Sequence, residues 1–208
     1  AQTPLLIDQS QKVYGAVRSQ GGKDFSPPGY LTCGMQSGDF DNKGTVKANR
    51  AIYCPLTQMA VDAGVRRTGF TYWEDNNDNG GVVSCDVAQR DAMTGFLYAK
   101  SNQIDEGQCE HLAGVDFGAG QQITAAQTST DYMCPENSVV FAGQNAPGKN
   151  DSWNSFYCVE LTSTAAPPPP ETVLLEAALD TSQNLYGLSG NQALEAHYGQ
   201  IMNTGDAG

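Results

Sequence analysis

Six cysteines that fall into three sequential pairs constrain the fold of this chain more than any other feature. The pairs, in chain order, are Cys33 with Cys54, Cys85 with Cys109, and Cys134 with Cys158. None lies in a Cys-x-x-Cys motif or near a histidine at zinc-ligand spacing, so the pattern predicts three disulfides rather than a metal or redox centre. The second cysteine of each pair recurs about every 50 residues, an interval typical of repeated structural units.

Each pair brackets two apolar segments that are joined by a polar loop. In the third pair these segments are residues 138–142 and 153–157. The 23 glycines, with many Asn, Gln, Ser and Thr residues, favour turns and short strands over long helices. We therefore expect each pair to clamp one strand–loop–strand unit, which favours sequential pairing among the fifteen connectivities that six cysteines allow.

A run of prolines at residues 167–170 divides the chain. Prolines cannot donate backbone hydrogen bonds and stiffen into polyproline II, so they end the folded core. We predict an all-β core of three disulfide-clamped, hairpin-like repeats packed as a β-prism or compact barrel, with N- and C-terminal extensions. The predicted boundaries are an N-terminal extension at 1–24, the core at 25–164, the linker at 165–170 and an apolar docking tail at 171–208.

Charge and the first residues predict an exported protein. Ala1-Gln2 is typical of the position after a signal-peptidase cut, which agrees with disulfides formed in an oxidising compartment. The net charge of −12 disfavours nucleic acid and anionic membrane surfaces as partners. Apolar stretches all fall short of the roughly 20 residues that span a bilayer. We expect an extracellular or cell-surface location, without membrane insertion.

The search for catalytic motifs predicts that the protein is not an enzyme. The sequence has no Gly-x-Ser-x-Gly elbow, no phosphate-binding Gly-rich loop with Lys and no His-Glu-x-x-His helix. Its two histidines, His111 and His197, are expected to be surface or packing residues. A secreted hydrolase that uses a carboxylate pair is the weaker alternative, and the sequence nominates no such pair.

Two local motifs suggest modification or ion binding. Asp75, Asn77, Asn79 and Asp86 match the oxygen-ligand positions of a calcium loop, although Asn79–Gly80 is equally typical of a plain hairpin turn. We expect no required cofactor, with calcium as the candidate ligand. Asn150 begins the sequon Asn150-Asp151-Ser152 and is the candidate glycosylation site.

A short sequence occurs near both ends of the chain. Residues 6–15 (LIDQSQKVYG) and 178–187 (ALDTSQNLYG) share Asp, Ser, Gln, Tyr and Gly at the same positions. The match is either chance or a sign that both ends make the same kind of contact. The residues predicted to mediate assembly are Leu6, Asp8, Val13, Tyr14, Leu179, Asp180, Leu185 and Tyr186.

The third unit also carries a resemblance to known families. It opens with Cys134-Pro135 and closes with Phe156-Tyr157-Cys158. Residues 134–158 thereby resemble a repeat of the vitelline membrane outer layer proteins and of the dermatopontins. The resemblance implies an extracellular coat or matrix protein with carbohydrate or protein partners and, for the first family, a three-sheet β-prism. The binding motifs of both families are degraded here, so no binding residue is carried over.

Two functions follow from the sequence as expectations. The first is an extracellular structural or assembly protein, a coat, matrix or filament subunit that associates with itself or with other extracellular proteins through its termini. The alternative is a secreted carbohydrate-binding module or adhesin. Aromatic residues near the cysteines are either sugar-stacking platforms or core residues; they are Trp73, Tyr98, Phe96, Trp153, Phe156 and Tyr157.

Overall fold

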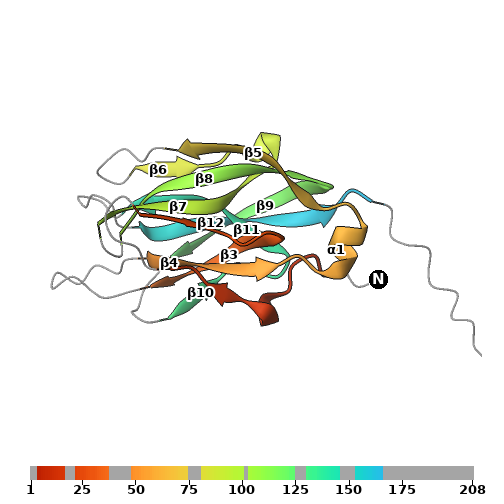
Figure 1. Ribbon diagram of the computed structural model, residues 1–208, viewed down its shortest axis with the longest axis horizontal. Coiled ribbons are helices and arrows are strands. Elements are labelled where there is room, and N and C mark those ends of the chain that lie inside the picture. Colours follow the sequence, from red (N-terminus) through yellow and green to blue (C-terminus); the bar gives the residue numbers. More distant parts are fainter. Residues whose placement is uncertain are drawn as a thin grey trace, which may run out of the picture. The chain divides into compact units, whose positions relative to one another are not determined.

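Three four-stranded antiparallel sheets form the folded part of the chain in the computed structural model (Figure 1). The structure describes residues 4–16, 22–37, 48–74, 81–100, 103–124, 130–145 and 153–165. The first sheet has the strand order β1-β4-β3-β10, the second β2-β7-β8-β5 and the third β6-β11-β12-β9. The strands are β1 (Val13–Tyr14), β2 (Gly22–Phe25), β3 (Tyr30–Ser37), β4 (Ala48–Pro55), β5 (Arg66–Glu74), β6 (Val82–Ser84), β7 (Asp91–Lys100), β8 (Gln103–Ala113), β9 (Val115–Thr124), β10 (Asp131–Met133), β11 (Ser138–Asn145) and β12 (Trp153–Ser163).

The same four-strand plan repeats three times along the chain. In each unit the third and fourth strands form a hairpin, and the first strand pairs with the fourth. The second strand leaves its own unit: β2 pairs with β7, β6 with β11, and β10 with β3. This exchange runs from the first unit to the second, to the third and back to the first. The predicted all-β fold with three repeats is confirmed, and the exchange links the three sheets in a cycle around two clusters of buried residues.

A β-bulge fixes each exchanged strand in the same way. One residue of β3, β7 and β11 is skipped in the hairpin register, and its carbonyl accepts a hydrogen bond from the residue after the incoming strand. These bonds are 2.7–2.8 Å long; they join Ser26 N to Thr94 O, Cys85 N to Phe141 O, and Cys134 N to Cys33 O. The three junctions are therefore structurally equivalent, although their residues differ.

All three predicted disulfides form, and each joins a sequential pair of cysteines. In the loop-entropy model, loops of this size contribute about 3 kcal/mol per bridge. The register corrects the expectation that the pairs are equivalent. Cys109 and Cys158 each face the residue before the bulge, and in the first unit that position belongs to Tyr53 rather than Cys54. The Cys33–Cys54 disulfide thus joins the two strands of one hairpin, β3 and β4. The other two disulfides join the residue after the second strand of a unit to its fourth strand.

The core draws side chains from all three sheets. Phe96 of the second sheet lies 6.5 Å from the ring of Tyr53 in the first and 5.8 Å from that of Trp153 in the third, measured between ring centroids. Tyr98 and Phe156 are buried beside them. These aromatic residues are therefore core residues rather than sugar platforms. Tyr157 is half-buried, and the side chain of Trp73 lies outside the described part of the structure.

The N-terminal segment differs from the predicted extension because it is part of the core. Leu6 and Ile7 are buried in the same cluster as Leu31 and Leu161. The first compact unit of the chain ends at Ala166, directly before the prolines. Residues 171–208 lie outside the described residues. Within the described residues, helices are short, and none has the length and apolar character needed to cross a bilayer.

Candidate functional site: the docked N-terminal segment

Residues 4–15, here called the N-terminal segment, run along the β4 edge of the first sheet and begin with a buried anchor. Asn137, which has a positive φ of 56°, accepts a 2.6 Å hydrogen bond from Leu6 N and donates one of 2.8 Å to Pro4 O. Leu6 O accepts from Thr57 N, the residue that caps helix α1 (Gln58–Asp62). The apolar pair Leu6 and Ile7 thereby enters the core between the first and third units.

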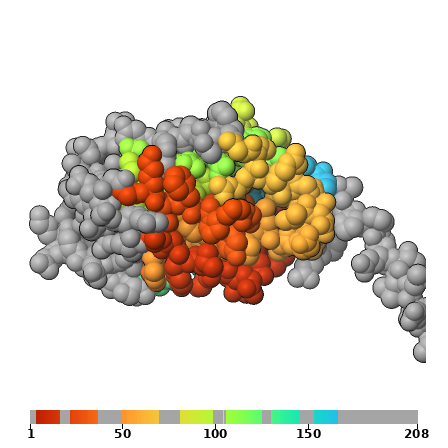
Figure 2. Space-filling view, in the orientation of Figure 1, coloured from red at the N-terminus to blue at the C-terminus, as the bar shows by residue number. Residues whose placement is uncertain are grey.

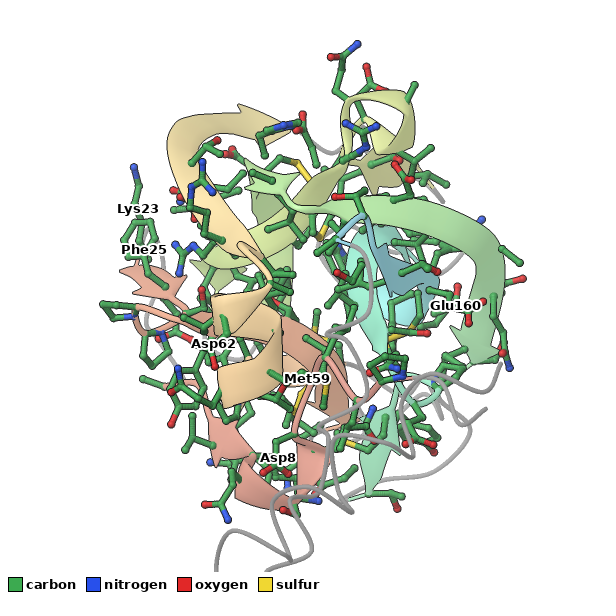
Figure 3. The ribbon with its side chains drawn as sticks, turned by 90° about the vertical axis from the view of Figure 1, so that its right-hand side faces the viewer. Asp8, Lys23, Phe25, Met59, Asp62 and Glu160 are labelled. Carbon is green, nitrogen blue, oxygen red and sulfur yellow. A yellow bond between two sulfur atoms is a disulfide. The ribbon has the colours of Figure 1, made fainter. Side chains whose placement is uncertain are left out.

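A short turn follows the anchor. The Asp8 carboxylate accepts hydrogen bonds from Ser10 N at 3.0 Å and from Ser10 Oγ at 2.6 Å, which caps the 3-10 turn η1 (Gln9–Gln11). Gln9 Nε2 donates to Cys134 O at 2.9 Å and to Pro135 O at 3.2 Å. Asp8 therefore shapes the segment, and Gln9 ties it to the loop after β10. Figure 3 shows Asp8 at the surface, on the same side of the molecule as Met59 of α1.

The segment then becomes the edge strand of the first sheet. Val13 pairs with Tyr53 and Tyr14 with Ile52, and Gly15 N donates to Ala51 O at 2.8 Å. Gly15 fits because it has no side chain: a Cβ there would lie 2.2 Å from Asp24 Oδ2 and 3.1 Å from the Tyr53 ring. Figure 2 shows the N-terminal residues, in red, on the visible face beside orange residues from β4 onward in the chain.

A polar group, here called the Asp131 cluster, holds the outer side of this strand. It comprises Lys12, Tyr14, Gln36, Arg50 and Asp131. Lys12 Nζ lies 2.8 Å from Asp131 Oδ2, which also accepts from the Tyr14 hydroxyl, and Gln36 Nε2 donates to Asp131 Oδ1 at 3.1 Å. The Arg50 guanidinium stacks 4.5 Å from the Tyr14 ring centroid and donates through Nε to Gln36.

The protonation equilibria of the cluster follow from these contacts. Burial by itself raises the pKa of Asp131, but hydrogen bonds from Lys12 and Tyr14 outweigh it and lower the pKa below the usual value. The hydrogen bond to Asp131 raises the pKa of Lys12 and that of Tyr14. The docked segment therefore favours a charged Asp131, a charged Lys12 and a neutral Tyr14.

The structure places four of the predicted assembly residues in this one segment. Leu6 is buried and Asp8 caps the turn, whereas Val13 and Tyr14 are 37% and 41% exposed on the edge strand. Leu179, Asp180, Leu185 and Tyr186 lie outside the described residues. The sequence reasoning missed Asp131 and Asn137, which carry no local signal because the fold brings them from more than a hundred residues away. Gly15 was detectable, since it is identical in both copies.

The candidate calcium loop is only partly described. Asp75, Asn77 and Asn79 lie outside the described residues, whereas the Asp86 carboxylate caps the 3-10 turn η2 (Val87–Gln89) by accepting from Ala88 N and Gln89 N. The strands that flank Asn79–Gly80, β5 and β6, belong to different sheets and do not pair with each other as a hairpin. Among the described residues, no three acidic, histidine or cysteine side chains group as metal ligands would. The sequon Asn150 also lies outside the described residues.

Two surface cavities lie near β8. One, of about 470 Å³, is bounded by α1 and β5 and contains the ion pair between Arg67 and the buried Glu110. The other, of about 400 Å³, is lined in part by Asp91 and the half-buried His111, whose Nδ1 lies 3.2 Å from Asp91 Oδ1. Arg67 donates to Ser26 and Pro27 as well as to Glu110. The Arg67–Glu110 pair thus joins the second sheet to the loop after β2, a structural role.

The third sheet carries an uncharged polar patch around Tyr157. Tyr157 packs at 6.1 Å, between ring centroids, from Phe141, and its hydroxyl donates to Gln144 Oε1 at 3.0 Å. Gln122 Nε2 donates to Ser155 Oγ at 3.2 Å.

Comparison of the chain with protein-family models, with curated proteins and with solved structures found no match.

Proposed function

We propose that this protein is a structural subunit of an extracellular coat, matrix or filament and that it associates through its termini. One observation carries the proposal: of the five residues that the two terminal copies share, Asp8 and Ser10 shape the turn of the N-terminal copy, and Tyr14 and Gly15 contact the rest of the chain. The second copy, residues 178–187, therefore has part of the determinants of the same contact.

The shared residues serve distinct parts of that contact. Asp8 caps the turn and Ser10 donates to it, Tyr14 binds Asp131, and Gly15 occupies a site with no room for a side chain. The second copy has Asp180, Ser182, Tyr186 and Gly187 at the matching positions. The fifth identity, Gln11, is exposed. Four of the five identities thus fall at residues that shape or hold the docked segment, which favours a shared contact over chance identity.

The apolar positions agree with the same interpretation. Ile7, which is buried, corresponds to Leu179, and Val13 corresponds to Leu185. The three disulfides suit an oxidising, extracellular environment. The resemblance of residues 134–158 to extracellular coat and matrix families supports the same assignment, and the proposal requires no catalytic residue.

Deletion of residues 171–208 tests the proposed function. Wild-type chain should sediment as species that grow with concentration, whereas the deleted chain should remain a folded monomer, because the core keeps its three disulfides and its own N-terminal segment. Sedimentation velocity over a concentration series measures the first property, and far-UV circular dichroism checks the fold. Assembly that persists after the deletion would contradict the proposal.

The outer surface of the third sheet supports carbohydrate binding as a second candidate function. An aromatic ring beside amide side chains offers stacking and hydrogen bonding to neutral sugars, and Tyr157 lies beside Gln144 in this way. A glycan array probed with wild type and with Tyr157→Ala tests this function. Phe25→Ala is a matched control, because Phe25 is a 49% exposed aromatic in the second sheet, on the opposite side of the molecule from Glu160 of the third (Figure 3). Equal glycan binding by wild type and Tyr157→Ala would remove the candidate.

A further inference from the structure

The surface that receives the N-terminal segment is here called the β1 groove. It consists of the β4 backbone at Ala51, Ile52 and Tyr53, the carboxylate of Asp131 and the amide of Asn137. The corresponding edges of the second and third sheets are covered by β5 and β9. Among the described residues, each molecule therefore has one β1 groove, whereas the chain carries two copies of the sequence that fills it, residues 6–15 and 178–187.

The two copies differ at three positions where the N-terminal copy makes additional contacts. Leu6, a buried core residue, corresponds to Ala178. Gln9, which donates to Cys134 O and Pro135 O, corresponds to Thr181. Lys12, which forms the ion pair with Asp131, corresponds to Asn184. A tail segment in the groove would keep the shared contacts and lose these three.

We infer that the β1 groove accepts residues 178–187 of a second copy of this chain and that Leu6, Gln9 and Lys12 hold it closed to that segment. This inference rests on the proposed function and adds its acceptor site and its regulation. The shared contacts cancel between the two occupied states, so the residues that differ set the exchange equilibrium. The N-terminal segment is thereby autoinhibitory, and its release opens the groove.

A second molecule is the natural source of the incoming segment. The described chain ends beside Gly114, whose carbonyl accepts from Thr164 N at 3.0 Å. Four prolines follow, and a polyproline II run of that length extends about 12 Å as a semi-rigid spacer. A semi-rigid spacer disfavours a tight return of the chain, which favours a neighbouring molecule as the acceptor. Strand addition to β4 of that neighbour satisfies the same backbone groups that β1 satisfies now. Contacts of this head-to-tail kind produce rings or filaments.

The test exchanges the differing residues between the copies in the full chain. The triple variant Leu6→Ala, Gln9→Thr, Lys12→Asn weakens the N-terminal copy, and the triple variant Ala178→Leu, Thr181→Gln, Asn184→Lys strengthens the tail copy. Sedimentation velocity should show half-assembly at a concentration about tenfold lower for both variants than for wild type, which corresponds to about 1.4 kcal/mol. The second variant leaves the described core unchanged, so the test remains decisive if the first fails to fold. Gln11→Ala, at an exposed position, is the matched control and should behave as wild type.

Each contrary result has a distinct meaning. Unchanged assembly in the tail-strengthened variant overturns the inference, whereas loss of assembly on deleting residues 171–208 would still support the proposed function. Enhanced assembly that survives that deletion overturns both. If the variants stay monomeric while protease releases residues 1–16 faster, the tail has displaced the segment within its own chain, and the second copy is the wrong occupant.

Discussion

The hydroxyl of Tyr53 donates a 2.9 Å hydrogen bond to the buried carboxylate of Asp24, and this bond joins β4 to β2 where the other two units have a disulfide. Tyr53 is the register equivalent of Cys109 and Cys158. Ser26, which follows β2, is the equivalent of Cys85 and Cys134. In the other two units a disulfide links the residue after the second strand to the fourth strand. The first unit has instead the hydrogen bond from Tyr53 to Asp24, which lies two residues before Ser26.

This equivalence predicts a fourth disulfide in the double variant Ser26→Cys, Tyr53→Cys. The corresponding native pairs have Cα–Cα distances of 5.5 and 5.7 Å, and the same junction geometry should bring the new pair within bonding distance. Peptide mapping without reduction should show the new linkage beside the three native ones. Free thiols at both positions would show that the three junctions are not equivalent.

Removal of the Tyr53 hydroxyl should destabilise the core. Tyr53→Phe removes a buried hydrogen bond to a carboxylate, and we expect a loss of about 1–3 kcal/mol in the free energy of unfolding. Urea denaturation monitored by fluorescence measures the change. Tyr157→Phe is a control, since its hydroxyl contacts Gln144 on a half-buried outer surface, and its loss should be smaller.

The same hydroxyl should make stability depend on alkaline pH. Burial, and then the negative charge of Asp24, raise the pKa of Tyr53 in the folded state above its ordinary value of 10.0. A raised pKa means that the unfolded chain loses this proton first, so the contribution is complete below about pH 10 and declines above it. The difference in unfolding free energy between wild type and Tyr53→Phe should therefore shrink as pH rises above 10. A difference that is constant through that range would contradict the prediction.

The Asp131 cluster predicts an acid-sensitive N-terminal segment. The pKa of Asp131 is lowered in the folded state from its ordinary value of 3.8, so its contribution is present above that pH and is lost as pH falls through the folded pKa. Hydrogen exchange of the Gly15 amide, which is bonded to Ala51 O, reports release of the segment. Protection at Gly15 should fall below about pH 4 while that of the central strand β8 persists. In Asp131→Asn the protection should be lower near neutral pH and should depend less on acid.

A methyl group at Gly15 should also displace the segment. The added Cβ would overlap the Asp24 carboxylate in a site closed by Tyr53 and Ala51, and overpacking of this kind costs about 1–3 kcal/mol. Gly120→Ala is the matched control, because its new Cβ would have no neighbour closer than 3.7 Å. Thermal melting of both variants measures the difference, and equal melting temperatures would show that the close approach at Gly15 is not tight.

Local sequence was sufficient to predict the β-rich fold and the sequential disulfides, and it gave a core role as one of two alternatives for Phe96, Tyr98, Trp153 and Phe156. Strand-forming segments, polar loops and cysteine order are all properties of neighbouring residues, and each disulfide closes a short loop within one unit. Part of the docking pattern was visible for the same reason, since Asp8 caps its own turn and Gly15 recurs in the second copy.

Only the tertiary structure decided which strands pair across the units. A strand exposes the same backbone donors and acceptors to any partner. The residues of β2, β6 and β10 therefore do not specify which sheet each strand joins. That exchange separates β5 from β6, puts Tyr53 at a cysteine position and brings Asp131 to the N-terminal strand. These relationships depend on long-range pairing, whose energy comes from the closed core as a whole rather than from any one segment.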